Sequence, residues 1–72
     1  MVNLDKLKGK IREKRFTIYS LAVAIGMNPA TLYRRFEVNG ETFTIGEVTA
    51  IARELRLSYE ELNEIFFEKK VA

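Results

Sequence analysis

The chain has 72 residues, contains neither cysteine nor histidine, and carries a formal net charge of +2. This composition excludes disulfides and thiolate metal sites, and it lacks the commonest general base and metal ligand. We expect one domain over residues 1–72 that buries about 60% of its unfolded surface. With no signal peptide and no run of ~20 apolar residues, the sequence predicts a cytoplasmic protein that is not an enzyme and needs no cofactor or metal.

Five helices are predicted in succession, each preceded by a residue that can cap its first turn. The predicted caps are Asn3, Thr17, Asn28, Thr44 and Ser58. Two of these caps are followed three residues later by a glutamate, Glu47 or Glu61, which is the spacing of a capping box. The sequence therefore predicts an all-α fold, a compact arrangement of five helices.

Apolar pairs support these helix starts. In each case the residue before the cap and the fourth residue of the helix are both apolar, which allows a hydrophobic staple. The pairs are Val2/Leu7, Phe16/Leu21, Met27/Leu32, Phe43/Val48 and Leu57/Leu62. The expected core consists of Leu4, Leu7, Ile11, Leu21, Ala22, Ile25, Leu32, Phe36, Phe43, Val48, Ile51, Leu55 and Leu62.

Residues 17–36 predict two short helices joined by a tight turn. The first helix has one apolar stripe, formed by Ile18, Leu21, Ala22 and Ile25. Gly26 can end this helix in the left-handed conformation, and the proline after Asn28 fits the first turn of the next helix. The two helices must cross steeply, and a small residue at position 22 leaves room for the crossing. This layout is typical of a helix-turn-helix, whose second helix enters the DNA major groove.

At this point the sequence resembles a known family. Ala22, Ile25, Gly26, Met27 and Leu32 resemble the helix-turn-helix of phage Cro and repressor proteins. The start of the helix after residue 43 and the run LSYEELNEIFF over residues 57–67 are similar to the C-terminal half of such small regulators. The resemblance covers about residues 4–67 and implies a lambda-repressor-like domain that binds double-stranded operator DNA.

Two positions depart from the family pattern. Ile18 stands where glutamine is frequent, and Arg35 stands where an apolar residue is usual. We expect Phe36 to take over that core position, so that Arg35 turns toward DNA or solvent. The C-terminal end of the reading helix would then be rotated relative to the common form.

The resemblance implies that the exposed face of the third helix reads DNA. Its candidate residues are Asn28, Pro29, Ala30, Thr31, Tyr33 and Arg34. Ala30 and the Thr31 methyl group suit a thymine methyl group, and Arg34 can bind guanine or a phosphate. Asn28 is either a helix cap or a partner for adenine. Tyr33 either stacks on the DNA or shields the core.

Phosphate contacts are expected at the edges of the motif. The candidates are Thr17, Tyr19, Arg35 and Asn39, with Gly40 as a further donor and Lys8, Lys10 or Arg15 as added charge. Residues 37–43 are predicted as a loop, with a tight hairpin at Asn39-Gly40 as an alternative. A strand over residues 16–25 is a second alternative, favoured by β-branched and aromatic side chains.

The charges are unevenly divided along the chain. Residues 1–36 hold eight basic and two acidic side chains, a net charge of +6, whereas residues 37–72 have a net charge of −4. This division predicts a basic face that meets phosphates and an acidic face that avoids them. Alternatively, both sets of charges simply solvate the helix surfaces.

The C-terminal region is unusually apolar for a terminal helix. We expect Phe66, Phe67 and Val71 to form the interface of a homodimer on a pseudo-palindromic operator. Alternatively, these residues close the core of the monomer. The sequence thus predicts a sequence-specific regulator of transcription. The alternative function is a helical protein–protein interaction module, or a DNA-binding antitoxin, that uses the C-terminal apolar surface.

Overall fold

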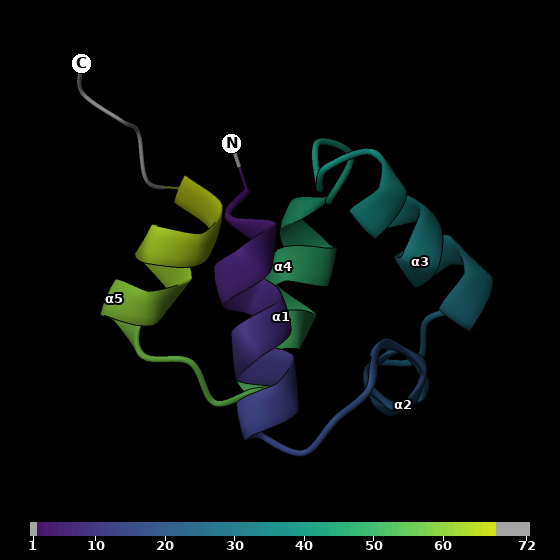
Figure 1. Cartoon of the computed structure of the whole chain (residues 1–72), viewed down its shortest axis with the longest axis horizontal. Coiled ribbons are helices and arrows are strands. Elements are labelled where there is room, and N and C mark those ends of the chain that lie inside the picture. Colours follow the sequence, from purple (N-terminus) through teal and green to yellow (C-terminus); the bar gives the residue numbers. More distant parts are fainter. Residues whose placement is uncertain (1, 68–72) are drawn as a thin grey trace.

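The computed structural model describes residues 2–67, and all of its regular structure is helical (Figure 1). The helices are α1 (Leu4–Glu13), α2 (Ile18–Ala24), α3 (Pro29–Glu37), α4 (Ile45–Glu54) and α5 (Tyr59–Leu62), which continues into a π-helical turn, η1 (Asn63–Phe67). The predicted all-α fold of five helices is confirmed, and no strand occurs between residues 2 and 67. The alternative strand over residues 16–25 is therefore wrong. None of the described helices is long and apolar enough to cross a membrane.

Each helix begins at its predicted cap. Side-chain oxygens of Asn3, Thr17, Asn28, Thr44 and Ser58 accept hydrogen bonds from backbone N–H groups in the first turn of their helices. The two predicted capping boxes are present, because Glu47 and Glu61 accept the N–H groups of their caps. A third box lies at α2, where the Ser20 hydroxyl accepts the Thr17 N–H at 2.9 Å. Local sequence signals thus determine where the helices start.

Four helices, α1 to α4, share one kind of ending. Arg15, Gly26, Asn39 and Arg56 follow these helices with positive φ angles of 64°, 72°, 59° and 53°. After each, the next residue donates its N–H to a carbonyl five positions earlier, as Met27 does to Ala22 at 2.8 Å. This Schellman ending satisfies free carbonyls and turns the chain sharply, so the helices connect through short turns. Only the ending at Gly26 was predicted, because side-chain-bearing residues seldom adopt this conformation.

Residues 38–44 form a loop between α3 and α4, as predicted, and not a hairpin. Asn39 and Gly40 both have positive φ, but they end α3 rather than join two strands. Gly40 is needed there for a second reason. A Cβ atom at this position would lie 2.8 Å from the Cβ of Val2, so a side chain would push the N-terminal segment away.

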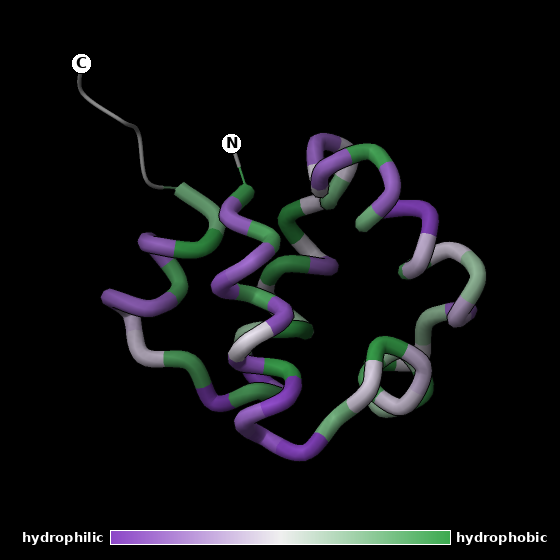
Figure 2. Tube along the Cα trace, in the orientation of Figure 1, coloured by the Kyte–Doolittle hydropathy of each residue, from purple (hydrophilic) through white to green (hydrophobic). Residues whose placement is uncertain are grey.

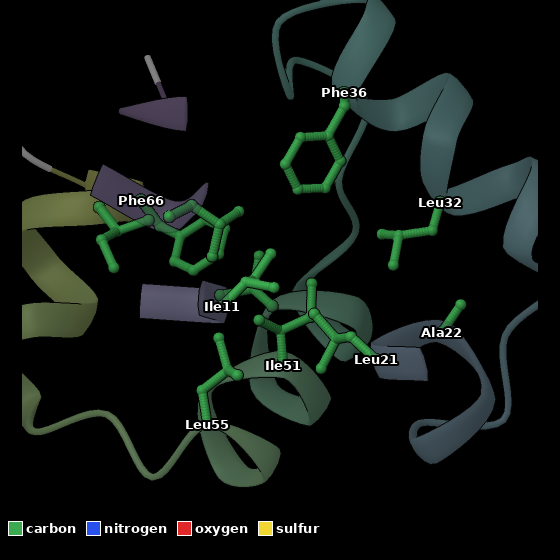
Figure 3. Close-up of a cluster of buried hydrophobic side chains, with 11 residues drawn as sticks. Ile11, Leu21, Ala22, Leu32, Phe36, Ile51, Leu55 and Phe66 are labelled. Atoms are coloured by element: carbon green, nitrogen blue, oxygen red, sulfur yellow. The ribbon is translucent and has the colours of Figure 1, made fainter. Parts of the chain in front are cut away.

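One hydrophobic core joins all the helices (Figure 3). Most of the predicted core is buried, while Leu4, Ile25, Phe43 and Leu62 are partly buried and pack against it. Ile65 and Phe66 belong to the core as well, at 0% and 6% exposure. Ile65 was not predicted there, and for Phe66 the alternative that it closes the monomer core is the correct one. The π-helical turn places both side chains inward, and the Ile65 carbonyl accepts the Asn3 N–H at 2.7 Å. The C-terminal segment is thereby fixed to the start of α1.

Candidate nucleic-acid interface

The helix-turn-helix is formed by α2 and α3, which pack directly on each other (Figure 1). Ala22 is fully buried at this contact, and Figure 3 shows it beside Leu32 of α3, which is also fully buried. A larger residue at position 22 would separate the helices, as the sequence suggested. Pro29 occupies the first turn of α3, where no N–H is needed. The relative orientation of the two helices is therefore fixed by close packing and a tight turn.

The exposed face of α3 carries four side chains at helical spacing. Ala30, Tyr33, Arg34 and Glu37 are exposed, and Tyr33 retains 46% of its surface accessible to solvent. Leu32 and Phe36 lie on the buried face of the same helix. The structure thus brings three of the predicted reading residues together and adds Glu37, which sequence reasoning missed. Its spacing of three and seven residues from Arg34 and Ala30 was the signal that could have identified it.

Thr31 lies at the edge of this face because it is half-buried. Asn28 is exposed, but its side-chain Oδ1 accepts the Ala30 N–H at 2.8 Å. A bidentate contact to adenine needs both the oxygen and the nitrogen of the amide. In this conformation Asn28 is a cap, with its amide N–H groups available as donors.

The Arg35 side chain is directed at Glu47 of α4 instead of out into solvent, so the orientation expected from the sequence requires correction. Its Nε and Nη2 atoms donate to the two carboxylate oxygens of Glu47, each at 3.0 Å. Phe36 takes the core position as expected, with 8% exposure. Arg35 therefore lies beside the core rather than opposite it, and the first residues of α4 supply its acceptor.

This ion pair changes the acid–base properties of both residues. The hydrogen bonds with Arg35 have the largest effect and lower the pKa of Glu47; burial opposes them, and the hydrogen bond from the Thr44 N–H lowers the pKa further. The same hydrogen bonds raise the pKa of Arg35. Both side chains are about four-fifths buried, with 23% and 20% exposure. Arg35 is thus held in a charge-assisted, two-point contact and is not a free cation.

The start of α2 presents neutral groups. Thr17 is exposed, and its hydroxyl oxygen accepts the Ser20 N–H at 3.0 Å. Tyr19 is 59% exposed on the same helix. Ile18, which stands where glutamine is frequent in the family, is instead half-buried against the core. The phosphate-binding group expected from the family is thus replaced here by an apolar contact.

The loop after α3 offers fewer donors than expected. The N–H of Asn39 bonds to the Phe36 carbonyl at 3.1 Å, and the N–H of Gly40 bonds to the Arg35 carbonyl at 2.8 Å. Both backbone groups are therefore used to end α3, and Gly40 is buried. Of the donors proposed here, the exposed side-chain amide of Asn39 is the one still available.

The basic N-terminal half does not form one free basic face. Lys6 forms an ion pair with Glu64, and Lys10 pairs with Glu61 and, at 3.4 Å, with Glu13. The hydrogen bond to Glu61 raises the pKa of Lys10. Lys14 also lies 4.0 Å from Glu13, so that, with Arg35, four cations of that half are paired with carboxylates of this chain. Basic side chains of α1 thus pair with acidic side chains of the α5–η1 segment.

The motif itself carries no charge over a long stretch. Between Arg15 and Arg34 the sequence has no acidic or basic residue, and Figure 2 shows α2 without a strongly hydrophilic residue. Neutral hydroxyl, phenol and amide groups are its polar surface. Arg15 and Arg34 flank this stretch and are both exposed. Any phosphate contact made by residues 16–33 must therefore rely on neutral donors.

A family model of the Cro/C1-type helix-turn-helix DNA-binding domain matches residues 6–68. The chain belongs to this family. The match begins within α1 and covers α2 to α5 and the motif between residues 17 and 36, so the resemblance drawn from the sequence is confirmed. Membership makes the protein a DNA-binding domain of the helix-turn-helix class. No curated protein and no solved structure matches the chain.

The residues expected at a dimer interface fall into three different situations. Phe66 is buried and packs edge-to-face on Phe43, with ring centroids 5.8 Å apart. It therefore belongs to the monomer core, and its expected role in a dimer interface has to be revised. Phe67 is 55% exposed and remains available. Val71 lies outside the described residues.

Proposed function

We propose that this protein is a regulator of transcription that recognises a specific operator in double-stranded DNA through the exposed face of α3. The observation that carries this proposal is the capped, closely packed α2–α3 unit, which presents Ala30, Tyr33 and Arg34 together to solvent. Ala30 offers an apolar contact for a thymine methyl group, and Arg34 offers a bidentate contact for guanine. Thr31 and the Asn28 amide act at the edge of this face.

Contacts to the DNA backbone position the motif. We infer that Thr17, Tyr19 and the Asn39 side chain donate to phosphates, while Arg15 supplies positive charge at the N-terminal end of the uncharged stretch. Phosphate contacts set register and orientation without reading sequence. In this division of roles, specificity belongs to α3 and the neighbouring donors align it in the groove.

The protein is further proposed to bind as a homodimer through the surface around Phe67. This side chain lies at the rim of a hollow whose wall includes Val2, Phe43 and Val48. A two-fold dimer would place two copies of α3 about 34 Å apart, one turn of DNA, and would favour a pseudo-palindromic operator. Phe67→Asp should then lower the molecular mass in solution and weaken operator binding. Tyr59→Asp is the matched control, because Tyr59 is a 78% exposed aromatic residue of α5 outside that hollow.

Selection of bound sequences from random duplex DNA tests this function. Enrichment of one sequence with two related half-sites is expected for a specific dimer. Enrichment of a single half-site would support sequence-specific binding and contradict the proposed dimer. Equal retention of all sequences, or no retention at physiological salt, would contradict sequence-specific recognition.

A second candidate function is a protein-interaction module, including an antitoxin that binds DNA and a toxin. The exposed apolar side chains favour it, since Val23, Ile45 and Phe67 are 60%, 82% and 55% exposed. Such residues on a small domain are typical of partner surfaces. A stable complex with a protein partner that survives Thr31→Ala and Arg34→Ala, but not Phe67→Asp, would favour this function.

A further inference from the structure

We propose that Arg35 and Glu47 form a positioning pair that fixes α3 against α4 and thereby controls DNA affinity without touching DNA. This role rests on the proposed reading of DNA by α3. It adds a function for Arg35, on the side of α3 away from the exposed face, and for its partner Glu47 in α4. Arg35 was predicted as a DNA contact, but its side chain is held by Glu47. Its geometry gives it a different function.

The contact between Arg35 and Glu47 has two-point geometry. Both donors of Arg35 bond to Glu47 at 3.0 Å, one to each carboxylate oxygen. A planar guanidinium facing a carboxylate in this way fixes direction as well as distance. The two residues belong to different helices and are separated by a loop of seven residues, 38–44. The contact therefore constrains how α3 lies relative to α4.

Glu47 contacts both α3 and the cap of α4. The Oε1 atom that accepts from Arg35 Nε also accepts the N–H of Thr44 at 3.0 Å, and the Glu47 N–H donates to the Thr44 hydroxyl at 3.1 Å. One carboxylate thus holds the cap of α4 and the side of α3 at the same time. A shift of either helix would break hydrogen bonds in the other. This is a rigid link at the point where the reading helix ends.

Arg35 lies on the side of α3 that is turned away from its exposed face. At 3.6 residues per turn, Arg35 lies on the opposite side of the helix from the centre of the exposed face formed by Ala30, Tyr33, Arg34 and Glu37. A side chain there cannot reach a groove that the exposed face has entered. Its influence on DNA must pass through the orientation of α3. Because small misplacements of a recognition helix disturb every base contact together, the effect should be on overall affinity.

The neutralisation of Glu47 distinguishes this proposal from a phosphate contact by Arg35. If Arg35 reached a phosphate, Glu47 would compete for it, and Glu47→Gln would strengthen DNA binding. If the pair positions α3, Glu47→Gln weakens binding. Glutamine retains an oxygen for the Thr44 N–H, so this variant preserves the cap and removes the charge-assisted contact.

The experiment is a double-mutant cycle of Arg35→Met and Glu47→Gln on the duplex recovered by selection. Each single variant should weaken binding on the order of tenfold, and the double variant should be no weaker than the worse single variant, because both remove one interaction. The slope of log Kd against log salt should not change. Arg35→Lys should also weaken binding, because lysine is a point charge without the two-point fork.

Glu61→Gln is the matched control. Glu61 also occupies the third position of a capping box and also binds a cation, Lys10, but it lies in α5. Its neutralisation should destabilise the protein without changing DNA affinity or sequence preference. A purely structural role for the Arg35–Glu47 pair would make the two glutamine variants behave alike.

A readout in the free protein separates this proposal from the proposed function. Amide hydrogen exchange along residues 32–36 of α3 should accelerate in Glu47→Gln and not in Glu61→Gln, whether or not the protein binds DNA. Unchanged exchange, additive effects in the cycle, tighter binding by Glu47→Gln, or a salt slope flattened by about one per subunit in Arg35→Met would overturn the pair's role. Failure of the unmodified protein to select any sequence would overturn the proposed function alone.

Discussion

The α2–α3 motif and the contact between α1 and the α5–η1 segment are stabilised by opposite chemistry. Residues 16–33 carry no charge, and α2 packs on α3 through side chains such as Ala22 and Leu32. The α1 contact is lined on its surface by the ion pairs of Lys6 and Lys10 with Glu64 and Glu61. Three of the eight cations of the N-terminal half, Lys6, Lys10 and Arg35, thus pair with carboxylates of the C-terminal half, away from the proposed reading surface. On that surface, Arg34 is the basic side chain of the exposed face of α3.

The largest effect is expected from the packing of the uncharged motif. Leu32 is fully buried, so Leu32→Ala should lower the free energy of unfolding by about 2–5 kcal/mol through lost burial and a cavity. Denaturation by urea, followed by circular dichroism, measures it. Val23→Ala is the control, since Val23 is 60% exposed in the same motif and should change stability by no more than about 0.5 kcal/mol. A loss below about 1 kcal/mol for Leu32→Ala would mean that packing does not fix α3.

The salt dependence of DNA binding tests whether the ion pairs within the protein stay closed when it binds DNA. If Lys6, Lys10 and Arg35 stay paired within the protein, a dimer neutralises only roughly two to four phosphates, through exposed cations such as Lys8 and Arg15. The log–log slope should then be about −2 to −4, a loss of about 15- to 250-fold between 50 and 200 mM salt. Fluorescence anisotropy across a salt series measures the slope.

A matched pair of variants sharpens this measurement. Lys10→Gln should leave the slope unchanged because Lys10 is held by Glu61, whereas Arg15→Gln should flatten it. A slope steeper than about −6 would show that the ion pairs open on DNA and that the whole basic half faces phosphates, as the charge count along the sequence suggested.

Recognition by α3 gives a smaller and more localised effect. Arg34→Ala should cost about 1–3 kcal/mol on the selected duplex and relax the choice at one or two base pairs, because a bidentate base contact is lost. Competition binding against single-base variants measures it. Glu60→Gln, at an exposed position of α5, should leave the preference unchanged. Equal losses on every sequence would reassign Arg34 to a phosphate.

The sequence predicted what is local and missed what depends on distant contacts. All five caps and most of the core were predicted, because caps and apolar spacing act within a few residues. The contact of Arg35 with Glu47 spans 12 residues and depends on the turn at Asn39, so a family pattern could not show it. Phe66 was placed in the core only by the alternative interpretation, because the apolar C-terminal run was assigned to a dimer interface; its burial depends on the contact with Phe43 and on the packing of η1 against α1, which the sequence does not show. The charge count records signs without partners, so it could not show that Lys6, Lys10 and Arg35 are paired within the protein.

The smallest expected effect concerns the ion pairs at low pH. The hydrogen bond from Lys10 and that from the Ser58 N–H lower the pKa of Glu61 from its ordinary value of 4.5 to about 2. Because the folded state binds this proton less readily than the unfolded state, the contribution of Glu61 to stability is complete above about pH 4.5 and is lost as the pH falls toward 2. The midpoint of thermal unfolding should therefore fall over that range. Glu61→Gln and Lys10→Met should each flatten the fall, because each removes one member of the pair, while Val23→Ala should leave it unchanged. An unaltered profile in both variants would mean that the α1–α5 ion pairs contribute nothing to stability and that packing by Ile65 and Phe66 alone holds the C-terminal segment.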